Sequence, residues 1–196
     1  MKKARAKKSA SKKHVSKKLH LIAMVEDFNF SPRGEIEGVL LVVDGERVQV
    51  NFGKDHHVPH AIAIGQEIEM TVEHDSHVND PPEGDHPVYS FVRLDSADGE
   101  AHQGKKHTDT GVVTLTGTVR RLNYAKHGQP NGVVLETGDF VHLKPDGMRR
   151  SRLKIGQLVT AKGDSRPTWD GKLAIEAKSA KRVLAPKMPS ASNGKK

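Results

Sequence analysis

The chain has 196 residues, and its 32 Lys and Arg against 24 Asp and Glu give a formal net charge of +8. Aromatic residues make up only 4%, so any core must be built from Val, Leu and Ile, and the absence of cysteine excludes disulfides, thiolate metal sites and a cysteine nucleophile. No apolar run approaches the ~18 residues of a membrane span, and no apolar segment follows the charged N-terminal stretch. We therefore expect a soluble, cytoplasmic protein with no membrane partner.

The charge is divided into blocks along the chain. Residues 1–18 carry nine Lys or Arg and no acid, whereas residues 19–110 carry six basic and eighteen acidic groups. Residues 111–184 carry fourteen basic and six acidic groups, and residues 185–196 add three lysines. Blocks of opposite sign indicate segments with different partners.

The first segment, residues 1–18, consists almost wholly of Lys, Ala and Ser. It has too few apolar residues to order itself by burial, so we predict a disordered tail, with a second disordered basic tail over residues 185–196. In composition the first tail resembles the Lys/Ala/Ser tails of histone-like proteins, which implies an arm that lies along phosphate backbones. The alternative is a tail that only keeps the protein in solution.

Short runs of alternating apolar residues between residues 20 and 94 predict five β-strands. Their alternating residues are Leu21, Ala23 and Val25; Val39, Leu41 and Val43; Val48, Val50 and Phe52; Ile68, Met70 and Val72; and the Tyr89, Phe91 pair within Val88 to Leu94. Asp44-Gly45 predicts a hairpin between the second and third strands. Residues Val58 to Ile64 are long enough for one helical turn.

The same pattern recurs after residue 110, at a constant offset of 94 residues. The matching pairs are Leu21 with Leu115, Ala23 with Gly117, Val25 with Val119, Phe28 with Leu122, Phe30 with Tyr124, Gly34 with Gly128, Gly38 with Gly132, Val39 with Val133 and Leu41 with Leu135. After the loss of one residue, Val48 meets Val141, and further on Ile64-Gly65-Gln66 meets Ile155-Gly156-Gln157. We infer two copies of one all-β fold, residues 19–94 and 111–184, joined by a linker over residues 95–110.

Each copy resembles an oligonucleotide/oligosaccharide-binding (OB) fold. It has a long first strand with a small residue at its bend, Ala23 or Gly117, then a hairpin, a connection and a second hairpin. The resemblance covers residues 20–94 and 111–184 and implies two tandem five-stranded barrels. The aromatic-rich RNA-binding motifs of cold-shock proteins are absent. Proteins with this fold bind on the outer face of strands two and three, between the loops that join strands one to two and four to five.

This resemblance implies a nucleic-acid site on the basic second copy. If Val141 and Leu143 point inward, the period of two turns Phe140, His142 and Lys144 outward. Aromatic rings at the site would stack on unpaired bases, while Lys and Arg would neutralise phosphates. The candidate residues are Arg120, Arg121, Tyr124, Lys126, Phe140, His142, Lys144, Arg149, Arg150, Arg152, Arg166, Trp169 and Lys172.

Three of these assignments have a structural alternative. Trp169 could close the barrel as a core residue, and Tyr124 aligns with Phe30 and could be core as well. The cations Arg149, Arg150 and Arg152, with Lys154, could belong to a solvated loop.

The acidic first copy differs from the second copy at the positions that correspond to this site. Its corresponding outward residues are Arg47, Gln49 and Asn51, and its last loop, residues 75–87, is long and acidic. Negative loops repel phosphate, so direct nucleic-acid binding is not expected here. Three roles are open to this copy: packing against the second copy, recruiting a protein, or covering the basic tail until DNA or RNA displaces it.

Eight of the twelve histidines lie between His56 and His107, among many Asp and Glu. Imidazole with carboxylate suits zinc or another divalent ion, although these spacings match no closed site. No nucleophile elbow, phosphate-binding glycine loop or metalloprotease helix occurs. We therefore predict a non-catalytic, cofactor-free nucleic-acid-binding protein, with single-stranded DNA or RNA favoured. The alternative is a protein-interaction adaptor whose acidic, His-rich first copy binds its partner, with or without metal.

Overall fold

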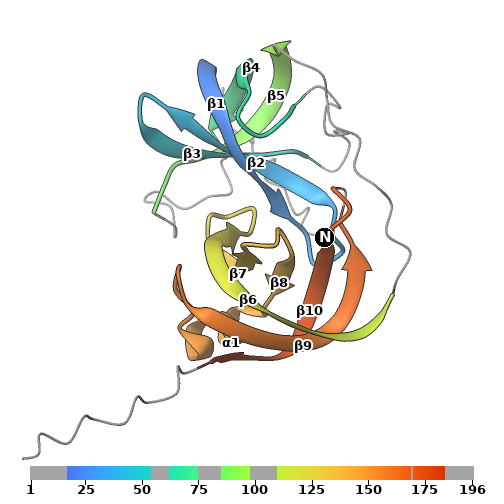
Figure 1. Ribbon diagram of the computed structural model, residues 1–196. Helices are drawn as coiled ribbons and strands as arrows, with labels where there is room; N and C mark the ends of the chain where they lie inside the picture. The colour runs from blue at the N-terminus through green and yellow to red at the C-terminus, as the bar shows by residue number, and fades with distance from the viewer. Residues whose placement is uncertain (1–16, 54–61, 75–84, 98–109, 169, 184–196) are drawn as a thin grey trace, which may run out of the picture.

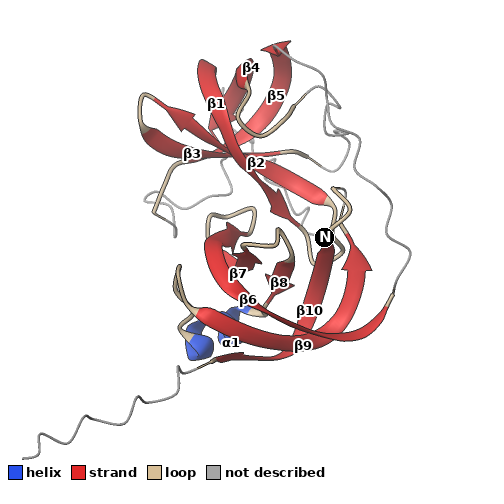
Figure 2. Ribbon diagram, viewed as in Figure 1, coloured by secondary structure: helices blue, strands red, loops and turns tan. Residues whose placement is uncertain are grey.

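The computed structural model describes residues 17–53, 62–74, 85–97, 110–168 and 170–183, which form ten strands and one short helix (Figures 1 and 2). The first five strands are β1 (Lys18–Phe30), β2 (Ile36–Val43), β3 (Glu46–Asn51), β4 (Glu67–His74) and β5 (Val88–Ala97). The remaining elements are β6 (Gly111–Tyr124), β7 (Pro130–Leu135), β8 (Phe140–His142), α1 (Pro145–Ser151), β9 (Leu158–Pro167) and β10 (Leu173–Arg182). Strand β5 thus extends three residues into the predicted linker. The two predicted tails lie outside the described residues, except for Lys17 and Lys18.

The strands close into two barrels of the same topology. The first has the order β1-β2-β3-β5-β4, and the second has the corresponding order β6-β7-β8-β10-β9. All pairs are antiparallel except β3 with β5 and β8 with β10, which are parallel. This is the strand order of an OB fold, and the prediction of an all-β, OB-like architecture is confirmed.

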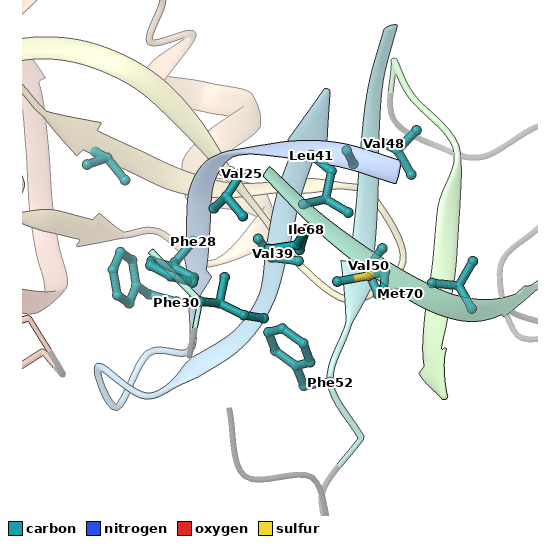
Figure 3. Packing of buried hydrophobic residues seen from close by; sticks show 14 of the residues in the cluster. Val25, Phe28, Phe30, Val39, Leu41, Val48, Val50, Phe52, Ile68 and Met70 are labelled. Carbon is teal, nitrogen blue, oxygen red and sulfur yellow. The ribbon is translucent and has the colours of Figure 1, made fainter. Parts of the chain in front are cut away.

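The core of the first barrel comes from the alternating residues of its strands. Val25, Val39, Leu41, Val50 and Met70 are almost fully buried and converge in the barrel interior (Figure 3). A closed barrel leaves no free sheet edge, and its inward side chains alternate with outward ones. The two aromatic residues at the end of β1 extend the same cluster towards the second barrel.

The second core is smaller and lacks aromatic rings. Its buried members are Val119, Val133, Leu135, Val141, Leu143, Leu153, Val159 and Ala161. Burial of Val141 and Leu143 confirms the predicted inward phase of β8. Gly117 lies against Leu135, and a Cβ at Gly117 would be only 3.1 Å from Leu135 Cδ1.

Two tight turns contain the residues that their backbone conformations require. Asp44 and Gly45 both have positive φ, 51° and 86°, as a two-residue hairpin between β2 and β3 requires, and this prediction is confirmed. Gly171, with φ of 78°, lies in the turn between β9 and β10, where the Thr168 N–H donates to the Lys172 carbonyl at 2.8 Å.

Corresponding irregularities occur in the first strand of each barrel. The β1–β2 register shifts between Val25 and Asp27, and the β6–β7 register shifts between Val119 and Arg121. A second shift follows in each strand, immediately before Phe30 and before Tyr124. Bulges of this kind bend a strand and re-aim its side chains.

The connection between β8 and β9 contains α1, which begins with Pro145 and is followed at its C-terminal end by Arg152 in the left-handed conformation. Most of the corresponding segment of the first barrel, where Val58 to Ile64 predict a helical turn, lies outside the described residues. Within the described part of the chain, no helix has the length and apolar character needed to cross a membrane.

Candidate nucleic-acid interface

The outward faces of β2–β3 and β7–β8 lie between the two barrels. Leu40 and Val134 are corresponding residues that point away from their own cores, yet both are fully buried. Gln49 Nε2 donates to the Ala125 carbonyl at 2.9 Å, and Asn51 Nδ2 donates to the Lys126 carbonyl at 2.5 Å. Each barrel therefore covers the face through which OB folds bind their ligands, and the first copy packs against the second.

Aromatic packing joins the two sides of this contact. The rings of Phe30 and Phe140 stack with centroids 6.1 Å apart, and Phe140, Val134 and Ala174 belong to the same apolar cluster as the first core. The His86 ring meets Tyr124 edge to face at 4.5 Å. The interface is thus continuous with the hydrophobic interior of the first barrel.

Two corresponding asparagines each accept a backbone hydrogen bond from the opposite barrel. Asn123 accepts a hydrogen bond from the Phe30 N–H and donates from Nδ2 to the Phe30 carbonyl, both at 3.0 Å. Asn29 accepts from the N–H of Tyr124, the counterpart of Phe30, at 3.4 Å. Reciprocal contacts between corresponding residues are those of an isologous, twofold-like interface.

A buried ion cluster lies beside these asparagines. Asp27 Oδ2 is 2.9 Å from Arg121 Nε and 2.6 Å from Arg120 Nη2. The Arg121 guanidinium also donates to the Phe28 carbonyl and to Asp27 Oδ1 at 3.1 Å. Burial lowers the pKa of Arg121, and the adjacent Asp27 carboxylate opposes that shift by favouring the charged form.

Three predicted nucleic-acid contacts are wrong because the interface buries them. Phe140 points out of its own barrel, as predicted, but is 0% exposed, and Arg121 and Tyr124 are also buried. The alternative assignment of Tyr124 as a packed residue is therefore the correct one. Arg120 is half exposed but ion-paired with Asp27. His142 is partly buried, and burial lowers its pKa, opposed by the nearby Glu176.

The other predicted cations reach solvent. Those on the surface of the second barrel are Lys126, Lys144, Arg149, Arg150, Arg152, Arg166 and Lys172. Only Arg149 among them forms an ion pair within the described chain, with Asp146. Trp169 lies outside the described residues, so no described aromatic side chain of the predicted platform is available for stacking.

Sequence reasoning missed four cations on the last two strands. Lys162, Lys178, Lys181 and Arg182 are all exposed. On β9 the alternation of Ala161 and Gly163 with Lys162 and Asp164 places the charged pair on the outside, and this period of two was visible in the sequence. Lys178 Nζ is bound by both oxygens of Asp164, at 3.0 and 2.8 Å.

The histidines of the first barrel show no metal site in the part of the chain that the structure describes. Of the eight His between residues 56 and 107, only His74 and His86 are described, and no group of three potential ligands forms. His86 is buried, with Nδ1 2.6 Å from Asp85 Oδ1 and Nε2 3.2 Å from Gln49 Oε1. Burial lowers its pKa, with Asp85 opposing. Its position makes it part of the barrel–barrel contact.

Comparison with known proteins adds little to this geometry. No protein-family model matches the chain, and no curated protein matches it. A search of solved structures returns the crystal structure of a deletion mutant of the single-stranded DNA binding protein from Thermus aquaticus. The match covers 90% of this chain and 98% of that chain at 16% identity, with a TM-score of 0.28. A TM-score this low supports no inference about fold or function.

Proposed function

We propose that this protein binds nucleic acid without catalysis, favouring single-stranded DNA or RNA, through the exposed cations of its second barrel. The observation that carries the proposal is the set of exposed basic side chains with no ion pair to a described carboxylate. These are Lys126, Lys144, Arg150, Arg152, Lys154, Lys162, Arg166, Lys172, Lys181 and Arg182. The positive charges of such a surface repel one another, and a bound polyanion offsets this repulsion.

The burial of Phe140 and Tyr124 changes the expected mode of binding. With these two rings in the barrel interface, affinity rests on phosphate contacts, and base stacking through them is not available. We expect binding that depends steeply on salt and that involves no stacking of bases on these two rings. The basic segment of residues 1–18 would add phosphate contacts to those of the barrel.

Fluorescence anisotropy tests the proposal, using the full chain with labelled single-stranded DNA, single-stranded RNA and duplex DNA at several salt concentrations. For single strands, the slope of log K against log[salt] should be about −0.7 for each phosphate contact. Replacing Lys162 and Lys181 by Ala should reduce both affinity and slope, whereas Arg33→Ala, which removes an exposed cation of the first barrel, should change neither.

Two results would overturn this assignment. One is binding that does not respond to salt. The other is binding that survives removal of the second-barrel cations and disappears when residues 1–16 are deleted, because the tail alone would then be the binding element.

A second function, protein recruitment by the first barrel, is favoured by one surface. Ile22, Met24 and Ile64 are 56%, 41% and 53% exposed, beside the acidic residues Glu67 and Glu69 of β4. The corresponding positions of β6 hold Thr116 and Thr118. Exposed apolar side chains with an acidic border fit a basic partner protein. Under this alternative, Ile22→Ser with Met24→Ser should abolish partner binding and leave oligonucleotide binding intact.

A further inference from the structure

A groove of about 600 Å³ lies between α1 and β10. In Figure 1, α1 is at the bottom of the view, on the side of the second barrel away from the first, so the barrel interface does not cover the groove. Its lining residues are Leu143, Lys144, Gly147, Arg150, Ser151, Asp164, Glu176, Ala177, Lys178, Ser179 and Ala180. Ligand sites in proteins typically enclose about 300–1,000 Å³.

Small residues create this space. Gly147 on α1 and Ala177 and Ala180 on β10 line the groove, where larger side chains would fill it. The helix itself is fixed at its end by Arg152, whose N–H donates to the Met148 carbonyl at 3.2 Å. The groove is therefore a recess between two defined elements.

Two cations of the groove are free to bind an anion. Lys178 is occupied by Asp164, but Lys144 has no ion pair in the described chain. Arg150 donates from Nε to the Asp146 carbonyl at 3.2 Å, which leaves the terminal amino groups of its guanidinium without a partner among the described residues. Such groups bind phosphate oxygens readily.

Glu176 is an unexpected neighbour for these cations. It pairs with Asp164 across the β9–β10 ladder, so two carboxylates border the same groove, and only Asp164 has a cation partner in the described chain. A carboxylate repels phosphate but accepts hydrogen bonds from amino groups. Cytosine, adenine and guanine carry an exocyclic amino group, and thymine and uracil do not.

We propose that this groove holds one nucleotide of a single strand, with its phosphate on Lys144 and Arg150 and the amino group of its base on Glu176. The inference rests on the proposed function and gives that function a preference for amino-bearing bases. A recess between a helix and a strand admits an unpaired nucleotide whose base is turned outward. A duplex, whose base edges are engaged in pairing, would reach only the rim.

Anisotropy with the full chain and labelled oligo(dC), oligo(dA) and oligo(dT) of equal length tests this site. The wild type should bind oligo(dC) about tenfold more tightly than oligo(dT). In Glu176→Gln the side-chain amide can both accept and donate hydrogen bonds. The affinities for oligo(dC) and oligo(dT) should therefore come within about twofold of each other. Lys144→Ala with Arg150→Ala should weaken binding to all three oligonucleotides and reduce the salt slope by about 0.7 per lost contact.

Glu136→Gln is the matched control, since Glu136 is an exposed acid of the same barrel outside the groove and should leave the dC-to-dT ratio unchanged. Thermal melting of each variant identifies any loss of fold. If wild type binds dC and dT equally and Glu176→Gln has no effect, the groove assignment is wrong while nucleic-acid binding stands. If the wild type binds no oligonucleotide, the proposed function itself is wrong.

Discussion

Asp27 and Arg121 occupy corresponding positions in the two barrels, and they form a buried ion pair across the interface, with Arg121 Nε 2.9 Å from Asp27 Oδ2. A symmetric dimer of either barrel alone would bring like charges together at this point, Asp against Asp or Arg against Arg. The sequence difference between the copies therefore favours pairing of the first barrel with the second over pairing of identical barrels.

Asp27→Asn should lower the free energy of unfolding by about 3 kcal/mol or more, because it leaves the Arg121 guanidinium buried without its counter-charge. Denaturant unfolding measures the change. Arg149→Ala is the control, since its pair with Asp146 is exposed and should contribute under about 1 kcal/mol. Equal effects of the two variants would contradict a stabilising role for the buried pair.

Gly34 should tolerate no side chain. Its φ is +82°, and a Cβ there would lie 2.5 Å from the Pro167 carbonyl oxygen of the other barrel. Gly34→Ala combines backbone strain with this clash, and we expect it to lower the free energy of unfolding by about 3 kcal/mol. Gly45→Ala has a similar φ of +86° and open space around the Cβ, and should cost about 1 kcal/mol. Similar values for both would show that the barrels do not meet at Gly34 in solution.

The period of two along β8 correctly predicted which side chains leave the barrel. Val141 and Leu143 are buried in the second core, and Phe140 points away from it. The alternation within one strand does not predict whether water or another barrel covers the outward side chains, because their exposure depends on how the two barrels pack together. The aromatic pair Phe30 and Tyr124 at corresponding strand ends was the available sign of a shared contact.

The candidate site was likewise predictable from the sequence only in part. Exposure of Arg150 and Arg152 could be predicted, because charged residues near a short helix rarely find burial. The groove could not, since it arises where Gly147 approaches Ala177 and Ala180, residues about thirty positions apart in the sequence. No local pattern encodes such a meeting of distant small residues.

Phe140→Ala separates packing from ligand binding. Phe140 is fully buried against Phe30, so its truncation should leave a cavity and cost about 3–5 kcal/mol of stability. Oligonucleotide affinity, expressed per folded molecule, should not change. Unfolding in denaturant and anisotropy on the same preparation give both quantities. A loss of affinity with unchanged stability would restore Phe140 as a base-stacking residue.

His86 should make the stability of the protein depend on pH. Burial lowers its pKa in the folded state below the ordinary value of 6.5, so the unfolded chain binds the proton more readily. The stabilisation from neutral His86 is complete above about pH 6.5 and is lost as the pH falls towards the lowered value, by at most about 1.4 kcal/mol per pH unit. The free energy of unfolding should be measured between pH 7.5 and about 5, above the pH range in which ordinary carboxyl groups titrate. His86→Gln should flatten this dependence, with the contribution of His142 remaining in both proteins. A wild-type curve that is parallel to that of His86→Gln would mean that His86 titrates alike in the folded and unfolded chain, and that its ring is not held against Tyr124 in the interface.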